Sequence, residues 1–395
     1  MHLLRILYVS VFLALLPTFV TAQETDSLVN RLNTINAAKY LKSIYKIDEA
    51  IDTLSTLVGP TFDEEVLSEL ADCHYQNGDL ENAAGTYLLL TSVNPTNLLY
   101  KVRQVAICYK LKAYGQAVEV GKEVLRIDSI SAIATLIGDS YNQMEQYDSA
   151  LVYYNQTLAI KPYNESVVSK VAKIYLDRQE YSEVIAISDA FLELSPDNIN
   201  IAPIKALALY LNGQYFPAID IYEKQLKLGN DTYSIHYYLG QCYWRTLLLY
   251  RAERELKAAW QLDSSDVNLA YSIAGALADA NRPFDDVKPW LDKALAMLEL
   301  DSSTLSRIYQ QYGLGYYRQD SWDQAIEHYK KAYNYNPQFI SALSTIAYCY
   351  EQKKEYKSAL EWYEKYLAVA KPGSNGYKFA LKSIEILKGE LFMEE

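Results

Sequence analysis

The chain has 395 residues, half of them hydrophobic, which is enough for a continuous core and excludes a disordered protein. Its formal net charge of −12 argues against nucleic acid and anionic membranes as partners, because both bind basic surfaces. Tyrosine occurs 37 times, and this residue can fill a core with its ring while its hydroxyl stays at the surface.

The first 22 residues predict a cleaved secretory signal peptide. Arg5 precedes an apolar run over residues 6–16 that is too short to span a bilayer, and small residues at 20–22 precede Gln23. A retained anchor helix is the alternative, but Pro17 interrupts the run, and no cysteine follows it for a lipid anchor. We therefore expect an exported protein, periplasmic or secreted, with no integral membrane segment after cleavage.

A small residue recurs along the rest of the chain at intervals of 33 to 38 residues. We call these ten places the register positions; they are Ala50, Ala83, Ala117, Ala150, Val184, Ala218, Ala252, Val287, Ala325 and Ala359. A fixed period of this length is typical of a solenoid of small supersecondary units rather than of one closed globule. Each unit then packs only on its neighbours, and the fold grows in one dimension.

Other residues keep fixed distances from the register positions. Twelve residues before them stands a second small residue, such as Ala71, which indicates two closely packed helices. Large residues stand three before and four after, such as Tyr147 and Tyr154, and these offsets share one helical face. Gly78 and Gly213 permit a left-handed turn between the two helices. The second helix is ended by Pro95, Pro162, Pro196 and Pro337.

Two segments carry the pattern most completely. One is Tyr309-Gln310-Gln311-Tyr312-Gly313-Leu314-Gly315-Tyr316 with Trp322, Ala325, Tyr329, Ala332 and Pro337, and the other is Ile137-Gly138-Asp139-Ser140-Tyr141 with Tyr147, Ala150, Tyr154 and Pro162. Both resemble the tetratricopeptide repeat, and the resemblance covers residues 31 to 373 in about ten units. It implies an all-α, right-handed superhelical solenoid of helix-turn-helix repeats, in which the first helices line a concave face that binds a partner.

The predicted domains are a signal peptide (1–22), the solenoid (23–373) and a C-terminal capping helix with its tail (374–395). The repeat around Val287 departs from the pattern, because Pro283 and Pro289 disturb its second helix and four extra residues follow near 300–304. We expect a longer loop there. The capping helix is expected to bury one side, formed by Tyr377, Leu381, Ile384, Leu387 and Leu391.

The four cysteines predict core positions rather than disulfides. Cys73, Cys242 and Cys349 lie ten residues before their register positions, and Cys108 lies nine before Ala117. We expect one equivalent site for all four, because the third unit is taken to have a shorter turn, with Ala106 eleven before Ala117. Equivalent sites in neighbouring repeats lie about 8–10 Å apart, beyond the limit of about 7 Å for a disulfide.

No motif indicates catalysis, a cofactor or a metal site. His74, His236 and His328 fall in three different repeats without metal-ligand spacing, and no nucleophile elbow, phosphate loop or dinucleotide fingerprint is present. An enzyme or its regulatory arm is a weaker hypothesis, because repeats fill nearly the whole chain after the signal peptide.

Aromatic and arginine side chains on the first helices form the candidate partner-binding surface. Its predicted residues are Tyr100, Arg103, Tyr210, Tyr237, Gln241, Trp244, Arg245, Arg307, Gln310, Tyr317, Arg318 and Tyr348. Tyr, Trp and Arg are enriched in binding hot spots, and two large rings flank a cation at Tyr237, Trp244 and Arg245. The alternative is that several of these rings only fill gaps between adjacent repeats.

The pattern therefore predicts a non-enzymatic interaction scaffold of the cell envelope that binds a protein or peptide segment in its concave groove. Its partner and any envelope complex are not identified by the sequence. The second hypothesis is an envelope protein that binds carbohydrate by stacking exposed tyrosine and tryptophan rings on sugars. Replacing Trp244 and Arg245 by alanine is expected to abolish partner capture without changing thermal stability.

Overall fold

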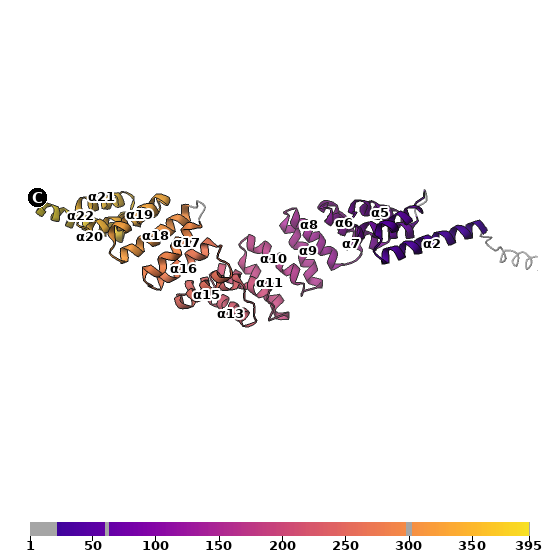
Figure 1. Ribbon diagram of the computed structural model, residues 1–395, viewed down its shortest axis with the longest axis horizontal. Helices are drawn as coiled ribbons and strands as arrows, with labels where there is room; N and C mark the ends of the chain where they lie inside the picture. Colours follow the sequence, from indigo (N-terminus) through magenta and orange to yellow (C-terminus); the bar gives the residue numbers. More distant parts are fainter. Residues whose placement is uncertain (1–21, 60–62, 298–301, 395) are drawn as a thin grey trace, which may run out of the picture. The chain divides into compact units, whose positions relative to one another are not determined.

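The computed structural model describes residues 22–59, 63–297 and 302–394, and within these ranges it contains 21 helices and no strand. The helices form ten consecutive pairs and one final helix (Figure 1). We call the first helix of a pair the A helix and the second the B helix. The prediction of an all-α solenoid of about ten helix pairs is confirmed. The predicted signal peptide lies outside the described residues except for Ala22, which begins the first helix.

The A helices are α2 (Ala22–Ser43), α4 (Glu64–Gln76), α6 (Leu98–Lys110), α8 (Ser131–Gln143), α10 (Glu165–Asp177), α12 (Ile201–Leu211), α14 (Tyr233–Arg245), α16 (Val267–Asp279), α18 (Ser302–Arg318) and α20 (Ser341–Gln352). The B helices are α3 (Ile47–Ser55), α5 (Leu80–Val93), α7 (Tyr114–Ile127), α9 (Tyr147–Ile160), α11 (Tyr181–Leu194), α13 (Tyr215–Lys227), α15 (Leu249–Leu262), α17 (Phe284–Ala296), α19 (Trp322–Tyr335) and α21 (Tyr356–Val369). The last helix is α22 (Asn375–Glu394).

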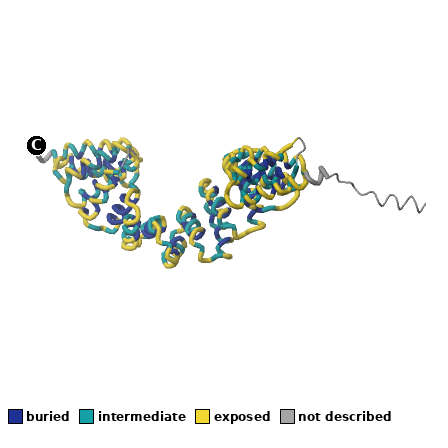
Figure 2. Tube along the Cα trace, turned by 45° about the vertical axis from the view of Figure 1, so that its right-hand side comes forward, coloured by how far each residue is buried: buried dark blue, intermediate teal, exposed yellow. Residues whose placement is uncertain are grey.

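The chain divides into two compact units, residues 1–174 and 175–395, with the boundary inside α10. Inside each unit, helices that follow one another along the chain pack together, as α8 and α9 do, and successive A helices also contact one another, as α12 and α14 do. Buried residues lie along the faces between the paired helices (Figure 2). This is the nearest-neighbour packing of a repeat protein.

The register positions form the centre of this core. The eight alanines are fully buried, and Val184 and Val287 are at most 3% exposed. The small residue twelve positions earlier makes room for a large one on the B helix. A Cβ on Gly138 would lie 2.7 Å from the Tyr154 ring, and one on Gly240 would lie 2.7 Å from Leu256. The small residue predicted at this place is therefore a packing requirement.

Each A–B turn contains one residue with a left-handed backbone. Gly78 and Gly213 adopt φ values of 78° and 76°, as their sequence context predicts. The other eight turns place an ordinary residue there, namely Tyr45, Lys112, Glu145, Gln179, Leu247, Asn281, Asp320 and Lys354. In the turn after α4, Asp79 N donates to His74 O at 3.0 Å, the hydrogen bond that closes a helix end on a left-handed residue.

The third repeat corrects one prediction. Its turn, residues 111–113, is as long as the turn at 77–79, so no residue is missing. Val105, fully buried, occupies the small position, and Ala106 does not. Ile107 is then the equivalent of Cys73, and Cys108 lies one place beyond it. Three cysteines share one site instead of four, although all four are buried as predicted and none is paired.

The repeat around Val287 is irregular, as predicted, but the extra residues go elsewhere than expected. The turn before α17 has four residues, 280–283, and Pro289 lies inside the helix. A longer loop was expected near 300–304, yet Ser302–Thr304 are helical. Helix α18 has 17 residues where α14 and α16 have 13 each, so the insertion lengthens this helix by about one turn.

Helix α22 covers the end of the stack. Ala380, Ile384 and Leu387 are buried against α21 and α20 in one hydrophobic cluster, with Tyr377 packed against it. Leu381, expected on this side, is 47% exposed, because it lies one residue beyond the buried face. Among the described residues, no helix has both the length and the apolar character needed to cross a bilayer.

Candidate functional site

Helix α16 lies at the centre of the candidate surface and is buried on every side. All ten residues from Leu269 to Ala278 are buried. Side chains from the two neighbouring A helices cover it. From α14, Tyr237 packs against the hydrophobic cluster that contains α16, and Gln241 Nε2 donates to the Ser272 hydroxyl at 2.7 Å. From α18, the Arg307 guanidinium lies 4.5 Å from the centre of the Tyr271 ring.

Trp244 belongs to this cover as well. Its ring packs on Gly275, where an added Cβ would lie only 2.4 Å from the ring, and its Nε1 donates to Asp279 at 2.7 Å. The structure therefore favours a different expectation for this ring, namely that its removal lowers thermal stability, because its loss would uncover α16. The packing of Trp244 thus supports the alternative raised in the sequence analysis, namely that its ring fills the gap between adjacent repeats.

Two further predicted site residues are buried. Tyr100 is 6% exposed and donates its hydroxyl to Glu64 at 2.9 Å, and Gln241 is 5% exposed. Neither can meet a partner without a rearrangement, because each already contacts the adjacent A helix. Sequence position placed them on the correct helices, but exposure depends on the size of the residues in the adjacent repeat.

The remaining predicted residues fall into separate groups. The Tyr210 ring lies 5.5 Å from that of Tyr238, and burial raises the pKa of Tyr210 although the charge of the exposed Arg245 lowers it. The rings of Tyr317 and Tyr348 lie 5.9 Å apart and share Trp322 as a neighbour. Gln310 lies 3.5 Å from the Ser306 hydroxyl. Arg103 is exposed and lies in the first unit, with its guanidinium 6.0 Å from the Tyr75 ring centre.

A pocket opens beside the irregular turn, between the end of α16, the start of α17 and α18, with a volume of about 370 Å³. Its apolar part includes Phe284, Val287 and Leu314. Phe284 packs directly on the α18 backbone, since an added Cβ on Gly315 would lie 2.0 Å from its ring. The four-residue turn and its proline place Phe284 here, so the irregularity of this repeat creates the pocket.

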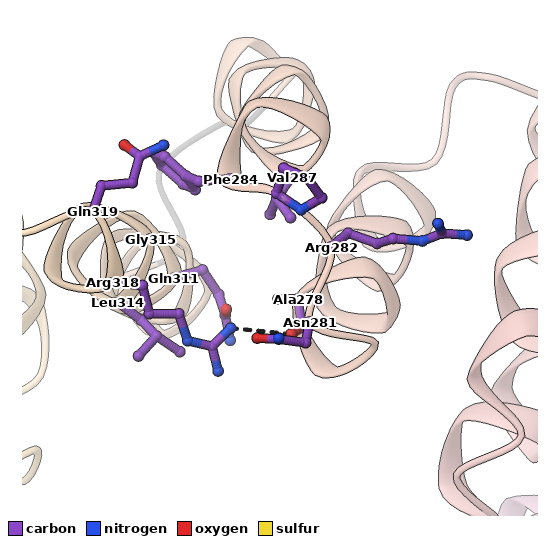
Figure 3. Close-up of a pocket in the computed structure, with 11 residues that line it drawn as sticks. Ala278, Asn281, Arg282, Phe284, Val287, Gln311, Leu314, Gly315, Arg318 and Gln319 are labelled. Carbon is purple, nitrogen blue, oxygen red and sulfur yellow. Dashed lines mark hydrogen bonds between the residues drawn. The ribbon is translucent and has the colours of Figure 1, made fainter.

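The polar part of the pocket is donor-rich. Arg318 donates one N–H to the Ala278 carbonyl at 3.2 Å, which holds its guanidinium at the pocket (Figure 3). Its other N–H groups make no ion pair among the described residues. Arg282 extends away from Arg318 and pairs instead with Glu253 at 2.9 Å. Amides line the rest, namely Asn281, Gln311 and Gln319, and no carboxylate lines the pocket.

This pocket can hold a peptide segment through an apolar side chain and its backbone carbonyls. Apolar walls with a few convergent polar groups are the usual build of a ligand site. Of the predicted residues only Arg318 lies here. The sequence flagged the repeat as irregular through Pro283 and Pro289, but gave no sign that Phe284, Gln311 and Leu314 would meet.

The side chains of Cys242, Cys349 and His328 are packed inside the repeats. Burial raises the pKa of Cys242 and of Cys349 to about 12, so these thiols stay protonated. His328 is stacked on the rings of Tyr312 and Tyr316, 4.9 and 5.3 Å away, and its burial lowers its pKa. Within the described part of the chain, no cluster of three His, Cys, Asp or Glu residues could hold a metal ion.

The stacked helix pairs place this chain in the class of helical-repeat proteins. Within it, residues 132–164 and 313–375 match tetratricopeptide repeat family models. The chain therefore contains tetratricopeptide repeats.

Relatives at low identity span much of the chain. Anaphase-promoting complex subunit 3 of Schizosaccharomyces pombe is 24% identical over 53% of the chain and 31% of its own length. A TPR repeat-containing protein of Methanocaldococcus jannaschii is 22% identical over 82% of the chain and 60% of its own length. The solved C-terminal part of a TPR repeat-containing protein from Cytophaga hutchinsonii aligns with a TM-score of 0.49 at 17% identity, over 61% of the chain and 97% of that structure.

Proposed function

We propose that this protein is a non-catalytic interaction scaffold whose second unit binds an extended segment of a partner protein. The relatives support this class, since one is named as a subunit of a multi-protein complex and others as repeat proteins. The observation that carries the proposal is the pocket beside α16, α17 and α18, with an apolar floor and the Arg318 guanidinium, which has no ion pair within the described part of the chain. We call it the partner pocket.

The partner segment would place one apolar side chain against Phe284 and Leu314. Its backbone carbonyls, or an acidic side chain, would accept hydrogen bonds from Arg318 and from the amide of Gln311. The exposed guanidiniums of Arg245 and Arg307 would extend the surface along the neighbouring A helices. A largely preformed site of this kind limits the entropy lost on binding.

Export is a second part of the proposal. The apolar run at 6–16 and the small residues at 20–22 support cleavage after residue 22, and the assembly served would then belong to the envelope or to the secreted material. Cell fractionation with N-terminal sequencing of the mature chain tests this. A cytoplasmic chain that retains Met1 would contradict it.

Site-specific photo-crosslinking in the native cell tests the partner pocket. A photoreactive residue replaces Gln311, and the matched control carries it at Gln324, an exposed residue on the B helix α19. We expect adducts at position 311 to map to one short segment of one partner, because that segment would lie in the pocket. Adducts equally frequent at both positions, or scattered over many proteins, would contradict the proposal.

A further inference from the structure

A second pocket, in the first unit, lies between the B helices α7 and α9 and has a volume of about 550 Å³. Its apolar part comes from Leu125, Ala134, Ala159 and Ile160. Its polar part comes from Lys122, Arg126, Ser129, Tyr153 and Gln156, so no carboxylate is present. It lies on helices other than those of the partner pocket and does not depend on the function proposed there.

The two cations lie one helical turn apart on α7, so they face the same side of the helix. Lys122 Nζ donates to the Tyr141 hydroxyl at 2.7 Å and lies 5.3 Å from the ring centre. Behind it, Tyr141 and Tyr153 are stacked with ring centres 5.7 Å apart. These contacts hold Lys122 in place, and the hydrogen bond raises its pKa, so that it keeps its charge.

Neither cation is neutralised by the protein. Within the described residues, Lys122 and Arg126 form no ion pair, although the chain has more acidic than basic residues. The corresponding pocket one repeat earlier behaves differently, since there Lys101 pairs with Glu123 at 2.8 Å and both line the pocket. Two cations left without counter-charges beside an apolar cavity favour an anion with an apolar body.

We propose that the pocket between α7 and α9 binds an organic carboxylate with an apolar or aromatic body. The carboxylate would accept a forked pair of hydrogen bonds from Arg126 and a further one from Lys122. The body would lie against Leu125, Ile160 and the Tyr153 ring. Such a group is found on a free organic acid and at the C-terminus of a peptide with an apolar last residue.

The second unit contains a natural control for the lysine. Lys330 Nζ donates to the Tyr350 hydroxyl at 2.9 Å and lies 5.3 Å from that ring and 5.2 Å from Trp362. This repeats the contacts of Lys122 with Tyr141. Asn334 stands where the first unit has Arg126, so the second cation is missing there. The lysine–tyrosine contact by itself is therefore a contact between neighbouring repeats. Ligand binding would need Arg126 as well.

Calorimetric titration of the full chain with 3-phenylpropionate tests the proposal. We expect saturable binding that weakens about tenfold or more in Arg126→Gln and in Lys122→Met, and that is unchanged in Lys330→Met. Arg126 is exposed, so its variant is expected to keep the parent's melting temperature. The neutral 3-phenylpropionamide should not bind, because it lacks the charge.

Each alternative has its own outcome. Equal binding of the amide, full displacement by inorganic phosphate, loss in Lys330→Met as large as in Lys122→Met, or no binding at all would overturn the proposal. N-acetyl-alanyl-phenylalanine separates the two sources of the carboxylate. Tighter binding of this dipeptide than of 3-phenylpropionate assigns the site to a peptide C-terminus, and the reverse order assigns it to a free acid. Both orders support a carboxylate site.

Discussion

At the scale of single residues, the A–B turns store a small strain. Leu247 adopts φ of 61° between α14 and α15 and is 74% exposed, so little packing opposes a change there. A left-handed backbone costs a residue with a Cβ about 1–2 kcal/mol, and glycine avoids this cost. Gly78 and Gly213 occupy the same place in other turns without strain.

We therefore expect Leu247→Gly to raise the free energy of unfolding by about 0.5–1 kcal/mol, after the entropy that glycine gains in the unfolded chain is counted. Urea denaturation followed by circular dichroism measures this. The control is Phe216→Gly, at an exposed helical residue of α13, which should lower stability. A loss of stability in Leu247→Gly would contradict the claim that the backbone at Leu247 is strained.

His328 makes stability depend on pH. Burial among three tyrosine rings lowers its pKa below the usual 6.5, and this effect outweighs the charge of Glu327, while Lys331 and Lys288 act in the same direction as burial. Its Nδ1 is buried without a hydrogen-bond partner. The unfolded chain therefore binds a proton more readily than the folded chain once the pH falls below about 6.5.

Replacing His328 by phenylalanine should keep the ring stacking and remove this proton. As the pH drops from 7.5 to 5, we expect the free energy of unfolding of the parent to fall relative to that of His328→Phe. The fall is at most about 1.4 kcal/mol per pH unit. Above pH 7.5 the difference between the two proteins should stay constant. Denaturation midpoints at several pH values measure the difference. A difference that stays constant across this range would exclude the titration of His328.

The sequence predicted burial well at this scale and exposure poorly. Every register position is buried, because a period of 34 residues repeats one packing environment. Trp244 shows where such reasoning stops. Its ring is a cover and not a free contact surface because residue 275, in the next repeat, is glycine. Sequence spacing does not state how far a long side chain reaches across that boundary.

At the scale of elements, Gly275 sets the distance between α14 and α16. Its replacement by alanine gains helix propensity but forces the Trp244 ring to move, since the new Cβ would lie 2.4 Å from it. We expect a net loss of about 1–3 kcal/mol. The same change at Gly115 in α7, with no atom within 4 Å, should raise stability by up to about 1 kcal/mol. Equal effects at the two glycines, measured by urea denaturation, would contradict this packing.

Helix α18 shows how an insertion is absorbed. Four extra residues were expected to lengthen a loop, but α18 is four residues longer than α16. One turn of helix keeps every backbone group hydrogen-bonded and returns the side chains to nearly the same face. Tyr312 can then donate to Asp292 of α17 while Tyr316, one turn later, contacts His328 of α19. Periodicity located the insertion without determining its form.

At the scale of the whole molecule, the ten helix pairs divide into two units that each hold their own clusters of buried residues. The proposed sites are one in each unit, and both arise where a repeat departs from the average. A missing counter-charge distinguishes the pocket of α7 and α9, and a longer turn distinguishes the partner pocket. The regular repeats supply the framework that could be predicted, and the departures supply the sites that could not.

The most direct test of the central claim is the affinity of the crosslinked partner segment for variants of the partner pocket, measured by fluorescence anisotropy. Leu314→Asp should weaken binding about tenfold or more, and Arg318→Gln should also weaken it, with the melting temperature of Arg318→Gln retained. The matched control Leu262→Asp, at an exposed residue that ends α15, should bind like the parent. Parent-like affinity in both pocket variants would contradict the account.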